Sequence, residues 1–202
     1  MKKIVIIVSF ALLFGAALLI FECGAEKAQL RENIVRLHVI ANSDSAEDQA
    51  QKLRVRDAVL NYLTPQLEGV TSAEDAKLCI VKSIPQLQGI VTQQLAGEGS
   101  NLSVRVSLTE TYFDTRYYDT FALPAGIYSS LRIELGEAAG KNWWCVAFPS
   151  LCLPAAGQTF HDVAAGAGFS DNLSDTLTQK NKYEIRFFVL DFLGRFEKFF
   201  GN

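Results

Sequence analysis

The N-terminal segment constrains this chain more than any other feature of its sequence. Lys2 and Lys3 precede an apolar run of 18 residues, from Ile4 to Phe21. The run is as long as a long signal-peptide core and slightly shorter than a transmembrane helix, which needs about 20 residues. Because the lysines come before the run, the residues from 26 onward are expected outside the cytoplasm. The sequence therefore predicts an exported protein.

Two fates of this segment remain open. Cys23-Gly24-Ala25 ends in the small residue that signal peptidases prefer, so the chain can be cleaved after Ala25. Alternatively, residues 4–21 stay in the membrane as an anchor. Both fates give residues 1–25 as a signal peptide or membrane anchor and residues 26–202 as an exported globular domain. Membrane association is then either transient or through the N-terminus.

The composition of the exported part excludes several classes of protein. The chain is 49% hydrophobic and 20% charged, with 5 Pro and 14 Gly in 202 residues, which is typical of a globular domain. Its formal net charge is −3, and since residues 1–25 carry +1, the remainder carries −4. A nucleic-acid partner would require a basic surface, so we expect none. The same charge gives no attraction to an anionic membrane surface.

The first half of the exported part reads as one strand followed by helices. Residues 34–41 are rich in β-branched side chains, and their alternation predicts a strand with one face formed around Leu37 and the other around His38. The short polar residues 42–45 favour a turn and a helix N-cap, so a helix is expected over 46–63, before Pro65. A capping-box pattern predicts helix over residues 73–96, in two pieces or with a kink at Pro85.

The second half is mainly strands. Alternating patterns predict strands at 102–108, 111–118, 129–135 and 142–148, and a last strand through Tyr183, Ile185 and Phe187. Residues 155–181 read as a loop with one short helix. Apolar residues at helical spacing predict an amphipathic terminal helix from Val189 to Phe200. The fold class is therefore α/β or α+β, a single domain with a mixed sheet packed by helices.

The sequence contains no motif for a metal, a cofactor or a common hydrolase. It has two histidines, His38 and His161, and lacks the HExxH, CxxC, GxSxG, P-loop and GxGxxG patterns. We expect no metal, no cofactor and no enzymatic activity. The alternative is a secreted hydrolase that uses Cys145 as a nucleophile with one of the histidines as its base.

Two pairs of residues have a structural interpretation. Cys145 and Cys152 flank Pro149 in an exported domain, so a disulfide between them is expected. Cys79 is expected to stay a buried thiol among apolar neighbours on its helix. The helix over 46–63 has two apolar stripes, one through Leu53 and Leu60 and the other through Val55 and Val59, so it is expected to be covered on two sides. Asp57 lies on the first stripe, where it is expected to pair with Arg54, Arg56 or His38.

Two long blocks of the sequence resemble a known family. Residues 34–59, which begin Ile-Val-Arg-Leu-His-Val-Ile-Ala-Asn-Ser-Asp-Ser, closely resemble the N-terminal signature of the stage II sporulation protein R family. Leu131-Arg-Ile-Glu-Leu-Gly-Glu and the block that begins Gly140-Lys-Asn-Trp-Trp-Cys look like its second signature. The resemblance spans nearly the whole chain and departs in residues 155–181 and at the Phe-rich C-terminus.

The resemblance implies a signalling protein of endospore formation. Such proteins are made in the forespore, secreted across its membrane into the intermembrane space, and needed to activate a membrane-embedded aspartic protease of the mother cell. That protease processes the precursor of sigma factor E. A protein that activates a protease by contact needs a binding surface rather than a nucleophile. The candidate surface consists of the exposed face of His38, the turn with Asn42 and Asp44, and the pair Trp143 and Trp144.

The export prediction can be tested in producing cells. Protease added outside an intact cytoplasmic membrane should degrade residues 26–202, because the lysines preceding the apolar run hold the N-terminus on the inner side. The measurement is protease protection followed by immunoblotting, with a cytoplasmic protein as the control. A globular domain that remains protected until the membrane is dissolved would contradict export.

Overall fold

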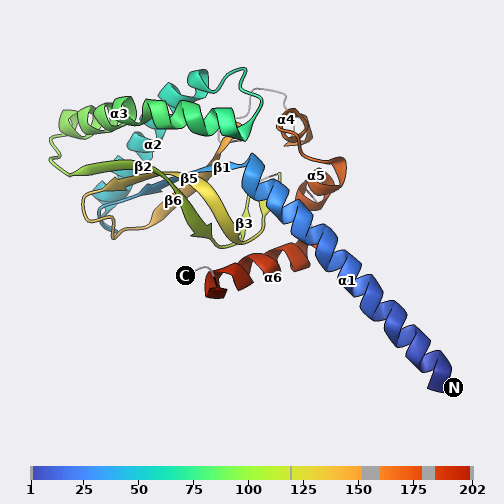
Figure 1. Cartoon of the computed structure of the whole chain (residues 1–202). Helices are drawn as coiled ribbons and strands as arrows, with labels where there is room; N and C mark the ends of the chain where they lie inside the picture. The colour runs from blue at the N-terminus through green and yellow to red at the C-terminus, as the bar shows by residue number, and fades with distance from the viewer. Residues whose placement is uncertain (1, 119, 152–159, 179–184, 201–202) are drawn as a thin grey trace. The chain divides into compact units, whose positions relative to one another are not determined.

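The computed structural model describes residues 2–118, 120–151, 160–178 and 185–200 (Figure 1). The elements, in chain order, are α1 (Lys2–Asn33), β1 (Val35–Ile40), α2 (Ala46–Gln66), α3 (Ala73–Gly97), β2 (Val104–Phe113), β3 (Arg116–Tyr117), β4 (Ala122–Leu123), β5 (Gly126–Leu135), β6 (Asn142–Phe148), α4 (Phe160–Gly166), α5 (Asp171–Thr178) and α6 (Ile185–Phe200). The chain forms two compact units. Unit 1 comprises Met1–Arg31, Tyr112–Ile127 and Ser170–Asn202, and unit 2 comprises Glu32–Thr111 and Tyr128–Phe169.

Unit 2 is built on a four-stranded mixed sheet. The strand order is β2-β5-β1-β6, with β1 parallel to β5 and antiparallel to β6. Helices α2 and α3 pack against each other and against β1, and Figure 1 shows both on one side of the sheet. The predicted fold class, a mixed sheet packed by helices after an apolar N-terminal segment, is confirmed.

Strand β1 separates two different environments. Val39 lies beside Trp143 in the register with β6, and the Arg56 guanidinium of α2 lies 5.0 Å from the centre of the Trp143 ring. Val39 and its neighbours at every second position therefore face α2. Arg36 and His38 project from the opposite face, as the alternation of side chains in a strand requires.

The two long helices begin where their caps predict and end later. Ser45 and Ser72 each accept a hydrogen bond from the backbone amide three residues on, so α2 starts at Ala46 and α3 at Ala73. However, α2 continues past Pro65, and α3 runs without a break through Pro85. Apolar side chains of α3 are buried on both sides of Pro85, and their burial outweighs the roughly 3 kcal/mol that an internal proline costs.

Three other predicted segments are corrected. Ile185 and Phe187 lie in α6, so the expected last strand is wrong there, and Tyr183 lies outside the described residues. The alternating apolar residues at 183–187 are followed directly by a helical pattern, so the segment fits the period of a strand or of a helix. In the structure the helix begins at Ile185. Within the expected loop over 155–181, the described residues 160–178 contain two helices, α4 and α5, where one short helix was expected. The expected strand over 111–118 is divided between the end of β2 and the short β3.

In unit 1, contacts of Asp191 and Gly194 hold α6 against Thr115 and Ala125. The Asp191 carboxylate accepts hydrogen bonds from the Thr115 hydroxyl, from the Ala125 backbone amide at 2.9 Å and from Arg195 at 2.8 Å. Burial alone would raise the pKa of Asp191, but these bonds outweigh it and hold the pKa below its usual value. A Cβ at position 194 would lie 1.5 Å from the Ala125 carbonyl oxygen, so glycine allows this close approach.

Helix α1 continues through the expected boundary after residue 25. It runs unbroken from Lys2 to Asn33, and by length and composition it is long and apolar enough to cross a membrane. An apolar helix at the N-terminus fits a secreted or membrane-anchored protein. Cleavage after Ala25 stays a prediction.

The cysteines differ in part from expectation. Cys145 is buried and disulfide-bonded, and Cys152, its expected partner, lies outside the described residues, so the pairing with Cys152 stays a prediction. Cys79 is a free thiol, but it is half-buried rather than buried. Its neighbours Leu78 and Val81 are exposed because the core-facing side of α3 passes through Ala76, Ile80 and Ser83.

Candidate contact site

Two loops meet at the end of the sheet where β1 and β5 finish. We call this region, residues 42–45 and 136–143, the tip. The Asn42 side chain joins the loops, because its Oδ1 accepts a hydrogen bond from the Glu137 amide at 3.0 Å and its Nδ2 donates to Asp48 Oδ2 at 2.9 Å. The Ala139 amide also donates to the Asn42 carbonyl oxygen at 3.1 Å. One asparagine thus connects the tip to the start of α2.

The Asp44 carboxylate makes the second connection across the tip. Its Oδ1 accepts a hydrogen bond from the Lys141 amide at 2.7 Å. Behind it, the Ser43 hydroxyl donates to Asp48 Oδ2 at 2.5 Å. Hydrogen bonds from Ser43 and Asn42 hold the pKa of Asp48 below its usual value. The turn is therefore fixed by bonds to a carboxylate that stays ionised at neutral pH.

A buried lysine supports the tip from α2. The Lys52 residue is 5% exposed, and its Nζ donates to Gln49 Oε1 at 2.6 Å and to the Lys141 carbonyl oxygen at 3.0 Å. Burial lowers the pKa of Lys52. Because the ammonium group bonds to a backbone carbonyl, it fixes the main chain at Lys141 while the Lys141 side chain stays exposed.

Two glycines allow the loops of the tip to approach so closely. A Cβ at Gly136, which has a φ of 57°, would lie 2.2 Å from Asn42 Oδ1. A Cβ at Gly140 would lie 2.2 Å from the Ser43 carbonyl oxygen. Any larger residue at either position must push the loops apart or lose these bonds.

Below the tip, His38 and Trp144 pack together on the sheet face opposite α2. Their ring centres are 5.7 Å apart, and His38 Nε2 lies 3.0 Å from Asn142 Oδ1, to which it donates. His38 is 6% exposed. Burial lowers the pKa of His38 to about 4, helped by the positive charges of Arg132 and Arg36 and opposed by the bond to Asn142. The imidazole is therefore neutral at physiological pH.

Charged residues extend this face across β5 and β2. Glu134 pairs with Arg132 at 2.9 Å and with Arg105 at 3.5 Å. The fully buried Arg36 lies with its guanidinium 5.4 Å from the centre of the Tyr128 ring. A desolvated cation over an aromatic face is a favourable arrangement.

The structure brings the five predicted contact residues to one end of the sheet, with different roles. His38 is buried, so the expectation that it presents an exposed face is wrong. A central strand covered on both faces leaves its side chain no route to solvent. Asn42 and Asp44 join the two loops of the tip. Trp143 and Trp144 are both half-buried and lie on opposite faces of β6, with Trp143 under Arg56.

The structure also places Arg54 and Asp57 of α2 differently from the prediction. Arg54 bonds to Glu98 through two nitrogen atoms, each at 2.6 Å. Asp57 does pair with Arg56, at 2.7 Å, but it is exposed rather than on the buried stripe. Of the two predicted stripes, the one through Val55 and Val59 is fully buried, whereas on the other Leu60 is buried and Leu53 is 39% exposed. We therefore expect Asp57 to contribute little to stability.

The structure does not form the pair of Cys145 with His38 that the alternative, a secreted hydrolase, would need. Cys145 lies beside Leu37 in the register, on the α2 face, whereas His38 projects from the other face. The disulfide also occupies the sulfur that a nucleophile needs. His161 lies in α4, and its side chain is outside the described part. Over the described ranges, no group of three or more His, Cys, Asp or Glu could hold a metal ion.

Sequence reasoning missed the residues that fix the tip from outside it. Asp48 and Lys52, which lie one turn apart on α2, were not among the predicted site residues. Short polar residues followed by an acid and a lysine on one helix face are a detectable signal. The roles of Gly136 and Gly140 depend on contacts with residues almost a hundred positions away, which no local pattern contains.

Comparison with known proteins identifies the family. A family model described as stage II sporulation protein R matches residues 31–158, which hold β1–β6 with α2 and α3. Stage II sporulation protein R of Bacillus subtilis (strain 168) is 38% identical over 160 residues, covering 75% of this chain and 71% of that protein. The chain belongs to the stage II sporulation protein R family. Membership supports a role in sporulation, and the match includes the whole tip. No solved structure matches the chain.

The close approach at Gly140 gives a first prediction for this site. Gly140→Ala should destabilise unit 2 by about 1–3 kcal/mol, because its Cβ overlaps the Ser43 carbonyl. The matched control is Gly89→Ala on α3, where a Cβ meets nothing within 4 Å and alanine should stabilise the helix by about 0.5–1 kcal/mol. Thermal unfolding of both variants provides the comparison. Equal effects of the two substitutions would show that the loops are not held in contact.

The low pKa of His38 predicts a pH-dependent stability. Below its ordinary pKa of 6.5 the unfolded chain binds a proton that the folded chain, with a pKa of about 4, does not. Stability should therefore fall as the pH decreases from about 6.5 to 4, by on the order of 3 kcal/mol at most. His38→Gln should remove this part of the decrease. Denaturant unfolding at several pH values measures it, and parallel curves for the two proteins would contradict the assignment.

Proposed function

We propose that this chain is an exported, non-enzymatic signalling protein of endospore formation. It is made in the forespore and delivered across the forespore membrane into the intermembrane space. There it activates a membrane-embedded aspartic protease of the mother cell, which processes the precursor of sigma factor E. Activation occurs by protein-protein contact. The N-terminal apolar helix directs this export and is either removed or kept as an anchor.

The observation that carries this proposal is the combination of family membership with the construction of the tip. The family match covers the tip completely, and the hydrogen bonds there fix the backbone rather than a reactive group. His38 is neutral and Cys145 is disulfide-bonded on the other side of the sheet, so neither acts as a base or nucleophile toward the other. A rigid surface of this kind suits binding, because little conformational entropy is lost on association.

The tip also presents suitable side chains. Glu137, Lys141 and Asn142 are exposed, and the bonds described above fix the backbone at Glu137 and Lys141. The half-buried Trp143 lies next to them under Arg56. Aromatic and arginine side chains at the centre of a contact, with charges around them, are typical of protein-protein interfaces. We infer that the protease binds this part of the protein and that its active state binds more tightly than its inactive state.

The test uses a charge reversal that leaves the fold unchanged. Lys141→Glu alters an exposed side chain and keeps the backbone bonds of residue 141. It should reduce activation about fivefold or more, corresponding to roughly 1 kcal/mol of binding free energy. The matched control is Lys82→Glu, an exposed lysine on α3, which should activate normally. The measurement is precursor processing by the protease in membranes with the full chain added, beside thermal unfolding of each variant.

The possible results test the proposed function and the proposed contact surface separately. If the unsubstituted chain does not stimulate processing, the proposed function is wrong. If it stimulates processing and both variants do so equally, the function stands and the tip is not the contact surface. Loss of activity in proportion to loss of stability would mark Lys141 as structural.

A further inference from the structure

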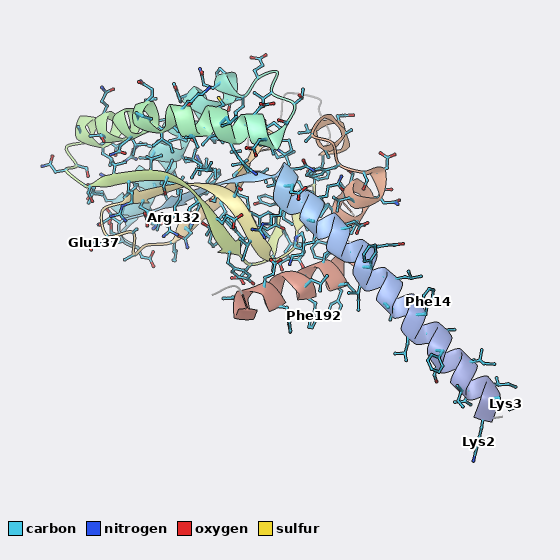
Figure 2. The ribbon with its side chains drawn as sticks, in the orientation of Figure 1. Lys2, Lys3, Phe14, Arg132, Glu137 and Phe192 are labelled. Carbon is cyan, nitrogen blue, oxygen red and sulfur yellow. The ribbon has the colours of Figure 1, made fainter. Side chains whose placement is uncertain are left out.

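Exposed aromatic side chains gather in unit 1 on one face of α6. Phe188, Phe192 and Phe196 follow each other at four-residue intervals and are 67%, 55% and 52% exposed. On the opposite side of the helix, Leu190 is fully buried and Gly194 contacts Ala125. The helix is therefore held on one side and presents an apolar stripe on the other. In Figure 2, Phe192 projects outward from α6.

The second observation is the distance from α6 to the apolar part of α1. Lys27 Nζ lies 2.6 Å from Glu197 Oε1, which places the end of α6 against α1 just past the apolar run. Lys27 is six residues after Phe21, or about 9 Å along a helix. The headgroup layer beyond the hydrocarbon core is about 5–7 Å thick. When the apolar run lies in a membrane, the contact with α6 is therefore near the membrane surface.

The distribution of the other exposed apolar residues is also consistent with α6 lying near the membrane surface. The large hydrophobic side chains exposed in the described part belong mainly to α1, α6 and Tyr117, which is 77% exposed in β3. In unit 2 they are Leu53, Leu78 and Val81, which are aliphatic and lie on α2 and α3. Aromatic side chains are enriched at the membrane interface, where an amphipathic helix buries its apolar face about 5–10 Å deep.

The acidic side chains of α6 are neutralised inside the protein. Asp191 is bonded to Thr115, Ala125 and Arg195, and Glu197 pairs with Lys27. Neither carboxylate therefore turns toward the phenylalanine stripe as an unpaired charge. This removes the electrostatic obstacle that an acidic helix would meet at an anionic lipid surface.

We propose that α6 lies in the lipid interface of the membrane that holds α1, with Phe188, Phe192 and Phe196 inserted between the lipid headgroups. This is a membrane-binding surface in addition to the apolar N-terminal helix. It lies outside residues 31–158, which the family model matches, and it does not depend on the function proposed above. It also gives the protein a second attachment to the membrane beside α1.

The test places a photoreactive amino acid on the stripe. The full chain is reconstituted in vesicles of phosphatidylethanolamine and phosphatidylglycerol with benzoylphenylalanine in place of Phe192, and irradiated. Mass spectrometry should find lipid attached to residue 192 several-fold more often than to a control probe in place of Val81. Val81 is 49% exposed, so the two probes have similar access to solvent. Thermal unfolding checks that both probes leave the fold intact.

A second arm tests the stripe as a unit. Phe188→Ser with Phe196→Ser, with the probe kept at 192, should lower lipid attachment because fewer side chains hold the helix at the interface. Leu78→Ser with the same probe should leave it unchanged. Lipid attachment at 192 no higher than at 81 would overturn the proposal. So would crosslinks from residue 192 to a second copy of the chain in place of lipid, which would assign the stripe to a dimer interface.

Discussion

The sheet of unit 2 depends on the burial of β1 on both faces. All six residues of this strand are buried, and it is the strand that pairs on one side with β5 and on the other with β6. One face is apolar and packs under α2 and α3. The other face contains Arg36 and His38, whose burial is tolerated because one lies against an aromatic ring and the other gives up its charge. The helices, the edge strand β6 and the tip are all positioned by this strand.

The position of the tip also follows from the pairing of β1 within the sheet. Because β1 and β5 are parallel, the loops that follow them leave the sheet at the same edge, and the polar residues after each strand can meet. Asn42 and Asp44 then accept hydrogen bonds from backbone amides of the second loop. These side chains were expected to contact a partner directly. Their bonds instead suit them to hold exposed neighbours such as Lys141 in place.

Features fixed by local chemistry were predictable from the sequence. The caps at Ser45 and Ser72 involve residues three positions apart, and both helix starts were correct. The alternation in residues 34–41 gave β1 and correctly separated Leu37 from His38. The same alternation did not show that the second face is also covered, so His38 was expected at the surface. A strand pattern shows that two faces differ, but burial of the more polar face depends on the rest of the fold.

Features that depend on distant contacts were not predictable in this way. Asp57 was expected on a buried stripe between Leu53 and Leu60, but that stripe is buried only in part, since Leu53 is 39% exposed. The second predicted stripe is fully buried at Val55 and Val59. The start of α6 was assigned to a strand because the alternation at 183–187 is short and overlaps the helical period. The contacts across the tip join residues almost a hundred positions apart. Their partners are specified by the parallel pairing of β1 with β5, which no single segment encodes.

The separation of the two surfaces along the chain bears on how a contact signal works at a membrane. The tip lies within the family-matched residues, whereas the phenylalanine stripe of α6 lies beyond them. Under the proposed function, a protein attached to the forespore membrane is confined to the narrow space that faces its partner in the mother cell. This confinement raises the effective concentration at which the two meet, so a modest contact would be enough to shift the partner toward its active state. A small tip with few aromatic side chains is consistent with this requirement. If both proposals hold, attachment through α1 and α6 raises the local concentration while the tip makes the contact, so substitutions on the stripe and on the tip should act independently of each other.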